Sequence, residues 1–325
     1  MVDSKDLLRL LADGRYHSGE EIAASIGVSR TAVWKHLNGL AELGLNVETV
    51  RGKGYRIPGG IELLAHEAIT SQLSMEAKAG LGKLEIALST DSTNAQVARS
   101  TLLAGSASVC FAEHQTAGRG RRGRSWVSPL ASNIYLSIGW CFDGGAEVLE
   151  GLSLAVGVAV CEALTGLGVD KLGLKWPNDV LRQRNKLAGV LIEMTGDVSG
   201  PCTAIVGVGV NVSVPASAAT QIEQAWADLR SSDGGSPSRN QVASALMNQL
   251  IPTLADYQTV GFGGWRDRWL RWDAYAGEQV IISSSSTEKL TGIARGVDSK
   301  GALVLQTDAG NVLVHGGEVS MRPVQ

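Results

Sequence analysis

The sequence predicts an α+β protein of several domains, because three consecutive stretches of the chain carry different patterns. At 325 residues the chain is longer than one hydrophobic core usually supports. Residues 1–60 show short helical patterns followed by a hairpin. Residues 61–273 mix apolar, strand-like runs with helical patterns, and residues 274–325 are rich in short strands. We therefore expect three domains with these boundaries.

Two short helices separated by a glycine-containing turn predict a helix-turn-helix in the first domain. Ser18 caps one helix, which Gly27 ends, and Ser29 caps the next. Alternating residues around Gly52 and Gly54 then predict a two-stranded wing. In this arrangement the start of the second helix reads the DNA groove. The residues expected to bind DNA are Ser29, Arg30, Thr31, Trp34, Lys35, Arg51 and Lys53.

The second domain is expected to contain a mixed sheet with helices packed on it. The runs that predict strands lie at residues 84–88, 109–113, 134–140, 189–194 and 204–212. The patterns that predict helices lie at residues 151–167 and 239–257. In the third domain, turn residues separate short strands at 279–282, 291–297, 302–307 and 311–315. These strands predict a small β-barrel of the SH3-like kind.

The composition and the termini restrict the class of protein. The formal net charge is −3, so any DNA contact must depend on a local basic patch. The N-terminus lacks the basic and apolar regions of a signal peptide, and the apolar segment 152–164 is too short to cross a bilayer. The four cysteines lie far apart, which predicts buried reduced thiols. We expect a cytoplasmic protein with no membrane partner and no metal centre held by side chains.

The run GRGRRGR at residues 118–124 is the sharpest local feature of the sequence. It contains the pattern G-x-G-x-x-G, but a dinucleotide-binding fingerprint should open a helix. Here residues 125–129 and a further strand follow instead. We interpret the run as a glycine-hinged loop that closes over phosphates, since the planar guanidinium group pairs with phosphate oxygens. A solvated basic loop is the alternative.

The motif KWPND at residues 175–179 precedes a second polar run that includes Lys186. Asn178, Asp179 and Lys186 are expected at strand ends that face one another across a hairpin. They would supply a carboxylate and an ammonium group to one cleft. The alternative is a simple turn followed by a polar hairpin loop.

Two further motifs follow strand candidates. Ser92 either caps a helix that begins near Asn94 or, with Thr93 and Gln115, lines a pocket for a neutral polar ring such as a ureido group. In the motif VGVGVN at residues 206–211, the glycines would let a ligand approach the strand backbone.

Together these motifs resemble, in order and in type, those of biotin–protein ligases. The whole chain is similar to the bifunctional ligase/repressor form, in which a winged helix precedes a class II synthetase-like ligase domain and an SH3-like domain. The resemblance implies ATP-dependent formation of biotinyl-5'-AMP, transfer of biotin to a lysine of a biotin carboxyl carrier protein, and biotin-responsive repression. It also implies Mg²⁺ with the substrates biotin and ATP, operator DNA as a partner, and a homodimer promoted by the adenylate.

The resemblance also implies residue roles. Lys186 would contact the reacting carboxylate and the α-phosphate, Asp179 would orient or deprotonate the acceptor lysine, and Arg119 and Arg121 would complete the catalytic set, with Arg119 near the carboxylate of biotin. The residues implied for biotin binding are Ser92, Thr93, Asn94, Gln115, Arg119, Gly120, Arg121, Lys186, Gly189 and Gly207. Those implied for ATP or the adenylate are Gly118, Arg121, Arg124, Trp126, Asn178, Lys186, Asn211, Trp226 and Arg322. Trp226 would stack on adenine, and a place in the core of a helix is its alternative.

Two other functions stay open on the sequence alone. One is a ligand-sensing repressor without catalysis, against which Asp179, Lys186 and the arginine run argue. The other is a ligase for a related acid such as lipoate, although the arginine pattern favours biotin. The helix-turn-helix could also be a protein-interaction module. The sequence leaves open the operator, the carrier, the dimer surface, the affinities and whether repression still operates.

Overall fold

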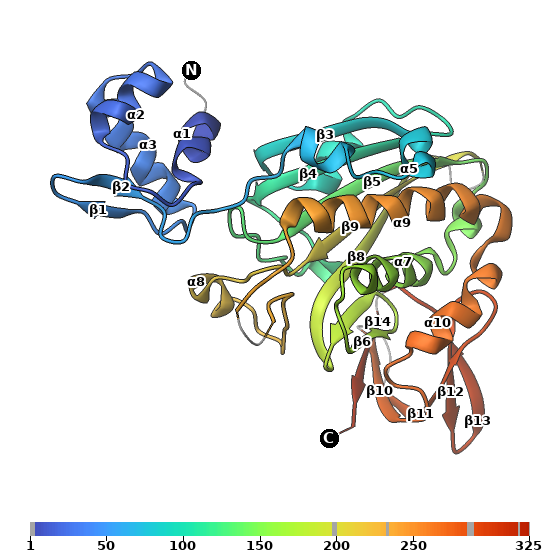
Figure 1. The fold of residues 1–325 in the computed structure, drawn as a ribbon. Coiled ribbons are helices and arrows are strands. Elements are labelled where there is room, and N and C mark those ends of the chain that lie inside the picture. Colours follow the sequence, from blue (N-terminus) through green and yellow to red (C-terminus); the bar gives the residue numbers. More distant parts are fainter. Residues whose placement is uncertain (1–3, 197–199, 232–233, 285–288, 318, 325) are drawn as a thin grey trace.

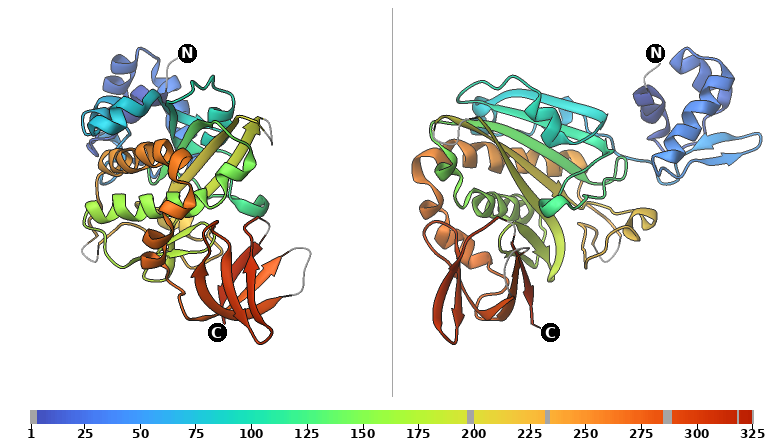
Figure 2. Two further views of the ribbon diagram at one scale, coloured as in Figure 1. Left: turned by 90° about the vertical axis from the view of Figure 1, so that its right-hand side faces the viewer. Right: turned by 180° about the vertical axis from the view of Figure 1, so that it is seen from behind.

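The computed structural model describes residues 4–196, 200–231, 234–284, 289–317 and 319–324. A small N-terminal unit is joined by one linker to a larger body, and the C-terminal strands lie on the opposite side of that body (Figure 1). The two turned views in Figure 2 show the same separation. The predicted α+β organisation is confirmed.

The N-terminal unit is a winged helix-turn-helix, as predicted. Its elements are α1 (Ser4–Leu11), α2 (Gly19–Ile26), α3 (Arg30–Glu42) and an antiparallel hairpin of β1 (Glu48–Val50) and β2 (Gly54–Arg56). Ser18 and Glu21 form a capping box at the start of α2, and the Ser29 hydroxyl accepts the N–H of Ala32 at the start of α3. A core of aliphatic side chains joins the three helices: Leu7, Leu8, Leu11, Ile22, Val33, Leu37 and Leu40.

The described part of the central domain contains a seven-stranded mixed sheet with the strand order β3-β4-β5-β9-β8-β7-β6. The strands are β3 (Leu81–Thr90), β4 (Ala107–Gln115), β5 (Ile134–Phe142), β6 (Leu172–Lys175), β7 (Asp179–Arg182), β8 (Asn185–Gly196) and β9 (Cys202–Val210). Strands β3 and β4 are parallel, and the other neighbours are antiparallel. All the strands expected in this domain are present. The short strands β6 and β7 were not among the predicted runs, although a hairpin joining Asp179 to Lys186 was.

Two long helices, α7 (Leu152–Gly166) and α9 (Arg239–Val260), cross one face of this sheet (Figure 1). The stretch 146–166, which joins η2 to α7, is 21 residues long and apolar enough to cross a membrane by length and composition alone. It is, however, 61% buried within the protein. Because α7 is apolar on nearly every side and buried on most of them, it is a core helix.

Short helices complete the central domain: α4 (His66–Thr70), α5 (Met75–Gly80), α6 (Thr93–Ala98), α8 (Ala216–Ala219) and α10 (Arg266–Trp272). Three 3₁₀ turns are η1 (Arg121–Gly123), η2 (Ala146–Leu149) and η3 (Phe262–Gly264). Of the α-helices, only α6 was expected, because helices of one or two turns give little periodic signal.

The C-terminal strands form an antiparallel sheet with the order β13-β12-β11-β10-β14. They are β10 (Gln279–Ser284), β11 (Leu290–Val297), β12 (Leu303–Thr307), β13 (Gly310–Val314) and β14 (Val319–Pro323). The strand-rich domain is confirmed, and β14 adds a strand that the sequence did not reveal. Val280, Leu305 and Met321 belong to the same hydrophobic cluster as the central domain. The two domains therefore share one core.

A buried polar cluster fixes the linker that follows the winged helix. Arg239, at the start of α9, donates to Glu113 at 2.7 Å, and these side chains are only 5% and 4% exposed. Arg239 also donates to the carbonyl oxygens of Glu62 and Asn133. The N–H of Leu64 donates to the other oxygen of Glu113 at 2.5 Å. The linker is thus held against the body by charge-assisted hydrogen bonds.

All four cysteines are reduced, as expected. Cys110, Cys161 and Cys202 are buried, whereas Cys141 is only half-buried. Burial raises the pKa of Cys110 to about 12, so its thiol stays protonated and unreactive.

Candidate active site

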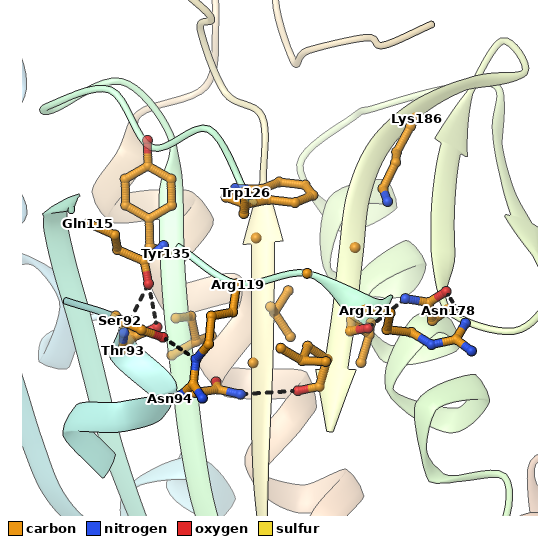
Figure 3. Close-up of a pocket in the computed structure, with 18 residues that line it drawn as sticks. Ser92, Thr93, Asn94, Gln115, Arg119, Arg121, Trp126, Tyr135, Asn178 and Lys186 are labelled. Atoms are coloured by element: carbon orange, nitrogen blue, oxygen red, sulfur yellow. Dashed lines mark hydrogen bonds between the residues drawn. The ribbon is translucent and has the colours of Figure 1, made fainter. Parts of the chain in front are cut away.

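A pocket in the central domain gathers most of the residues singled out in the sequence (Figure 3). Every residue implied for biotin binding lines it, together with Trp126 and Asn178 from the set implied for ATP. Gly118, Arg124, Asn211, Trp226 and Arg322 are not among the lining residues. Side chains from α6, β4, β8, β9 and the arginine loop (residues 118–124) therefore meet at one place.

One corner of the pocket is a network of neutral polar groups. The N–H and hydroxyl of Thr93 donate to the Gln115 carbonyl oxygen at 2.9 and 3.2 Å. Ser137, on β5, donates to the Thr93 hydroxyl at 2.7 Å. Ser92 stands at the N-cap of α6, but its side chain makes no capping hydrogen bond, so that alternative was wrong. A corner with neutral donors and acceptors suits an uncharged polar ring.

The glycines near this corner make room for protein side chains. A Cβ atom on Gly207 would lie 2.3 Å from the Asn94 carbonyl oxygen, and one on Gly209 would lie 2.5 Å from the Trp126 ring. The expectation that these glycines admit a ligand to the strand backbone thus needs correction, because Asn94 and Trp126 occupy the space directly above them. Both glycines still line the pocket.

An ion pair joins Lys186, which lines the pocket, to Asp179, which is not among the lining residues. The Lys186 ammonium nitrogen is 2.7 Å from an Asp179 carboxylate oxygen, and the two side chains are 18% and 17% exposed. Asp179 begins β7 and Lys186 lies near the start of β8, so the hairpin predicted to bring them together is present. The register shifts next to Lys186, as at a β-bulge, a feature that re-aims side chains beside active sites. The Lys186 ammonium also lies 5.5 Å from the centre of the Trp126 ring.

The arginine loop is partly packed against the body, so it is more than a solvated basic loop. Arg119 forms an ion pair with Glu193 at 2.8 Å. Arg121 donates to the Asn178 side-chain oxygen at 2.9 Å and to the carbonyl oxygen of Val319 in β14. By contrast, Arg124 is exposed. The loop contains the 3₁₀ turn η1, and the next described element is the strand β5 rather than an α-helix. This confirms that the run GRGRRGR is not a dinucleotide-binding fingerprint, which would open a helix.

Positive charge converges beside this loop. Burial is the main cause that lowers the pKa of Lys175, at the end of β6. The charges of Lys186, Arg322 and Arg124 lower this pKa further, while Asp179 opposes them. Arg322 comes from β14, so the C-terminal domain contributes to the same region. A cluster of this kind suits a polyanion such as a nucleotide phosphate chain.

Sequence comparisons agree with this geometry. The profile of the biotin/lipoate A/B protein ligase family matches residues 87–211, an HTH domain matches residues 4–56, and the biotin protein ligase C terminal domain matches residues 275–322. The bifunctional ligase/repressor BirA of Escherichia coli (strain K12) is 37% identical over 98% of this chain and 97% of its own length. This chain belongs to the bifunctional biotin ligase/repressor family.

Other members of the ligase/repressor family and solved structures support the assignment. BirA of Bacillus subtilis (strain 168) is 30% identical over 98% of each chain. The biotin protein ligase from Aquifex aeolicus, solved in complex with biotin and ATP, is 29% identical and has a TM-score of 0.63. It covers 75% of this chain and 100% of its own.

In this ligase/repressor, Trp226 and Asn211 stand beside the pocket. Trp226 lies in an extended segment that pairs with Lys186, whose N–H donates to the Ala225 carbonyl at 3.1 Å. The alternative, a place in the core of a helix, was therefore wrong. The Asn211 side chain is buried and donates to the Ala227 carbonyl at 3.0 Å, which holds this segment in place. Asn211 thus contacts the Trp226 segment and does not itself line the pocket.

The sequence analysis missed two polar residues of the site, Ser137 and Glu193. Ser137 lies in the apolar strand β5, and Glu193 lies in the apolar stretch 187–194 of β8. A polar side chain within an apolar stretch needs a hydrogen-bond partner wherever it is removed from water, and that is the signal by which the sequence could have indicated them.

Proposed function

We propose that this pocket binds biotin at its neutral corner and ATP at its cation cluster. The enzyme is a biotin–protein ligase that forms biotinyl-5'-AMP and transfers biotin to a lysine of a biotin carboxyl carrier protein. The observation that carries this assignment is the ion pair of Lys186 with Asp179, because Lys186 lines the pocket together with the neutral corner and its charge also acts on Lys175 in the cation cluster. The domain division that we propose for these roles is 1–60, 61–273 and 274–325.

In the first step the carboxylate of biotin attacks the α-phosphorus of ATP, and pyrophosphate leaves. Two anions must approach each other, so fixed positive charge lowers the barrier. We assign this task to Lys186 and Arg121, with Lys175, Arg124 and Arg322 near the phosphates. Removal of one fixed charge of this kind typically costs about 3–4 kcal/mol of barrier.

Mg²⁺ would accompany ATP in this step and neutralise part of the phosphate charge. Among the described residues there is no group of three or more histidine, cysteine, aspartate or glutamate side chains that could hold a metal ion. The ion would therefore be held mainly by phosphate oxygens and water, as Mg²⁺ often is.

The second step needs a neutral lysine amine on the carrier. Asp179 is the carboxylate nearest to Lys186, and it can orient or deprotonate the incoming amine. The adenylate must meanwhile be shielded from water. We assign this task to the arginine loop and to Trp126, whose indole ring packs over Gly209 in the pocket. Trp226 would stack on adenine.

The winged helix would bind operator DNA through the exposed start of α3 and the wing. Trp34, on α3, is 59% exposed. Arg30 is paired with Glu20 at 2.9 Å, and Lys53 lies 5.8 Å from the centre of the Tyr16 ring. The further contacts would come from Ser29, Thr31, Lys35 and Arg51. One such module has a small footprint, so we propose a homodimer on two half-sites, promoted by biotinyl-5'-AMP.

The proposal is tested by mixing the protein with biotin, ATP and Mg²⁺ and measuring pyrophosphate release and tightly bound adenylate. We expect Lys186→Ala to lose nearly all adenylate formation. Normal pyrophosphate release by this variant would contradict the role of Lys186. A biotinylation assay with a carrier domain separates the ligase from a non-catalytic sensor, and titration with biotin and lipoate separates the two acids. A cytoplasmic location follows from this activity.

A further inference from the structure

Glu193 is a carboxylate of strand β8 beside the pocket, and none of the roles above uses it. One of its oxygens accepts a hydrogen bond from the Asn94 amide nitrogen at 2.7 Å. The other accepts from the Arg119 guanidinium at 2.8 Å. The Glu193 side chain is 33% exposed. A single carboxylate thus links α6, at the neutral corner, to the arginine loop.

This contact determines how both partners are oriented. A carboxylate can only accept hydrogen bonds, so the nitrogen end of the Asn94 amide must face Glu193. The oxygen end then faces Ser137 and the space above Gly207. Arg119, held by Glu193, also donates to the Ser92 hydroxyl at 3.4 Å. Glu193 therefore determines the orientation of the hydrogen-bonding groups of Ser92 and Asn94, directly for Asn94 and through Arg119 for Ser92.

The pairing also changes the role of Arg119. Glu193 already compensates the positive charge of Arg119, so Arg119 attracts a second carboxylate, such as that of biotin, only weakly. The carboxylate of biotin is then left to Lys186 and Arg121, on the far side of the pocket. Arg119 instead forms an ordered part of the pocket surface where the ring of biotin would lie.

We propose that Glu193 is a positioning residue for biotin: it holds Asn94 and Arg119 in the arrangement that the ring of biotin meets. This inference rests on the proposed placement of biotin in the pocket. A pre-arranged site binds its ligand more tightly because less ordering is needed on binding. Glu193 should thus affect the affinity for biotin more than the chemical step.

The test is Glu193→Gln in the full chain. A glutamine offers one acceptor and one donor, so it can satisfy only one of the two donors that face it. We expect the KM for biotin to rise about tenfold, consistent with one lost hydrogen bond to a charged group. The kcat and the KM for ATP should change less than about threefold, because Lys186 and the cation cluster are untouched.

Glu85→Gln is a matched control. Glu85 also accepts from an amide of α6, that of Gln96 at 2.9 Å, and from a cation, Lys83 at 3.0 Å. Its side chain is 31% exposed, but it lies on β3 and does not line the pocket. We expect wild-type kinetic constants from this control. If Glu193→Gln instead lowers kcat only in proportion to the loss of folded protein and leaves the KM for biotin unchanged, Glu193 is only structural and the inference is overturned.

Two further variants keep the outcomes separate. If Glu193→Gln does not fold, Glu193→Asp replaces it, since the shorter carboxylate cannot reach both donors, and an unchanged KM for biotin again overturns the inference. Thr93→Val tests the placement of biotin itself. If Thr93→Val raises the KM and the Glu193 variants do not, the inference fails while the proposed function stands. If Thr93→Val has no effect, the placement of biotin fails.

Discussion

The buried pair of Glu113 and Arg239 allows a sharp prediction about stability. We expect Glu113→Gln to lower the free energy of unfolding of the central domain by about 3–5 kcal/mol, the usual cost of leaving one charge of a buried pair uncompensated. Both side chains are almost fully shielded from water, at 4% and 5% exposed. The glutamine can still accept from the N–H of Leu64, so the loss reports on the uncompensated charge of Arg239.

This loss of unfolding free energy converts into a measurable shift of the urea concentration at the midpoint of unfolding. With a slope of about 3 kcal/mol/M, the upper part of the range for small proteins, the unfolding midpoint should fall by roughly 1–2 M. The transition is best followed by tryptophan fluorescence, because a multidomain chain need not unfold in one step. Glu150→Gln is the control. Glu150 pairs with Lys300 at 3.2 Å, but its side chain is 47% exposed, so we expect a loss of less than about 1 kcal/mol.

The result that would refute this reasoning is an equal, small shift for Glu113→Gln and Glu150→Gln. The double variant Glu113→Gln/Arg239→Met provides a second check. It removes both charges, so it should recover much of the stability lost in Glu113→Gln. If the losses of the single variants simply add, the two groups do not interact as the structure indicates.

Two more predictions concern the loop and the pH. Arg121→Ala should release biotinyl-5'-AMP faster, by about tenfold or more, because it removes the contacts with Asn178 and Val319 that hold the loop; unchanged dissociation kinetics would count against the loop as a shield. Burial lowers the pKa of His114 below its usual 6.5, so as the pH falls below about 6.5 the unfolded state takes up the proton more readily than the folded state and the free energy of unfolding decreases. Urea midpoints at pH 7.5 and 5.5 should therefore differ more for the wild type than for His114→Gln, and equal differences would contradict this.

Local signals in the sequence were sufficient for much of the fold. Ser18 and Ser29 mark the starts of their helices because a side-chain cap satisfies backbone N–H groups within three residues. The hairpin that joins Asp179 to Lys186 follows in the same way from a short turn between two strands. The short helices other than α6 and the strand β14 carry too few residues for a clear period, and so they were missed.

The sequence by itself predicted a three-part organisation, the family resemblance and many of the residues that line the pocket. Only the tertiary structure decided that α7 is a core helix, that Trp226 lies in an extended segment, and that Glu193 joins Asn94 to Arg119. The physical reason is the range of the interactions. Caps, turns and periodicity act between residues close in the chain, whereas these contacts depend on which strands are neighbours and in which register they pair.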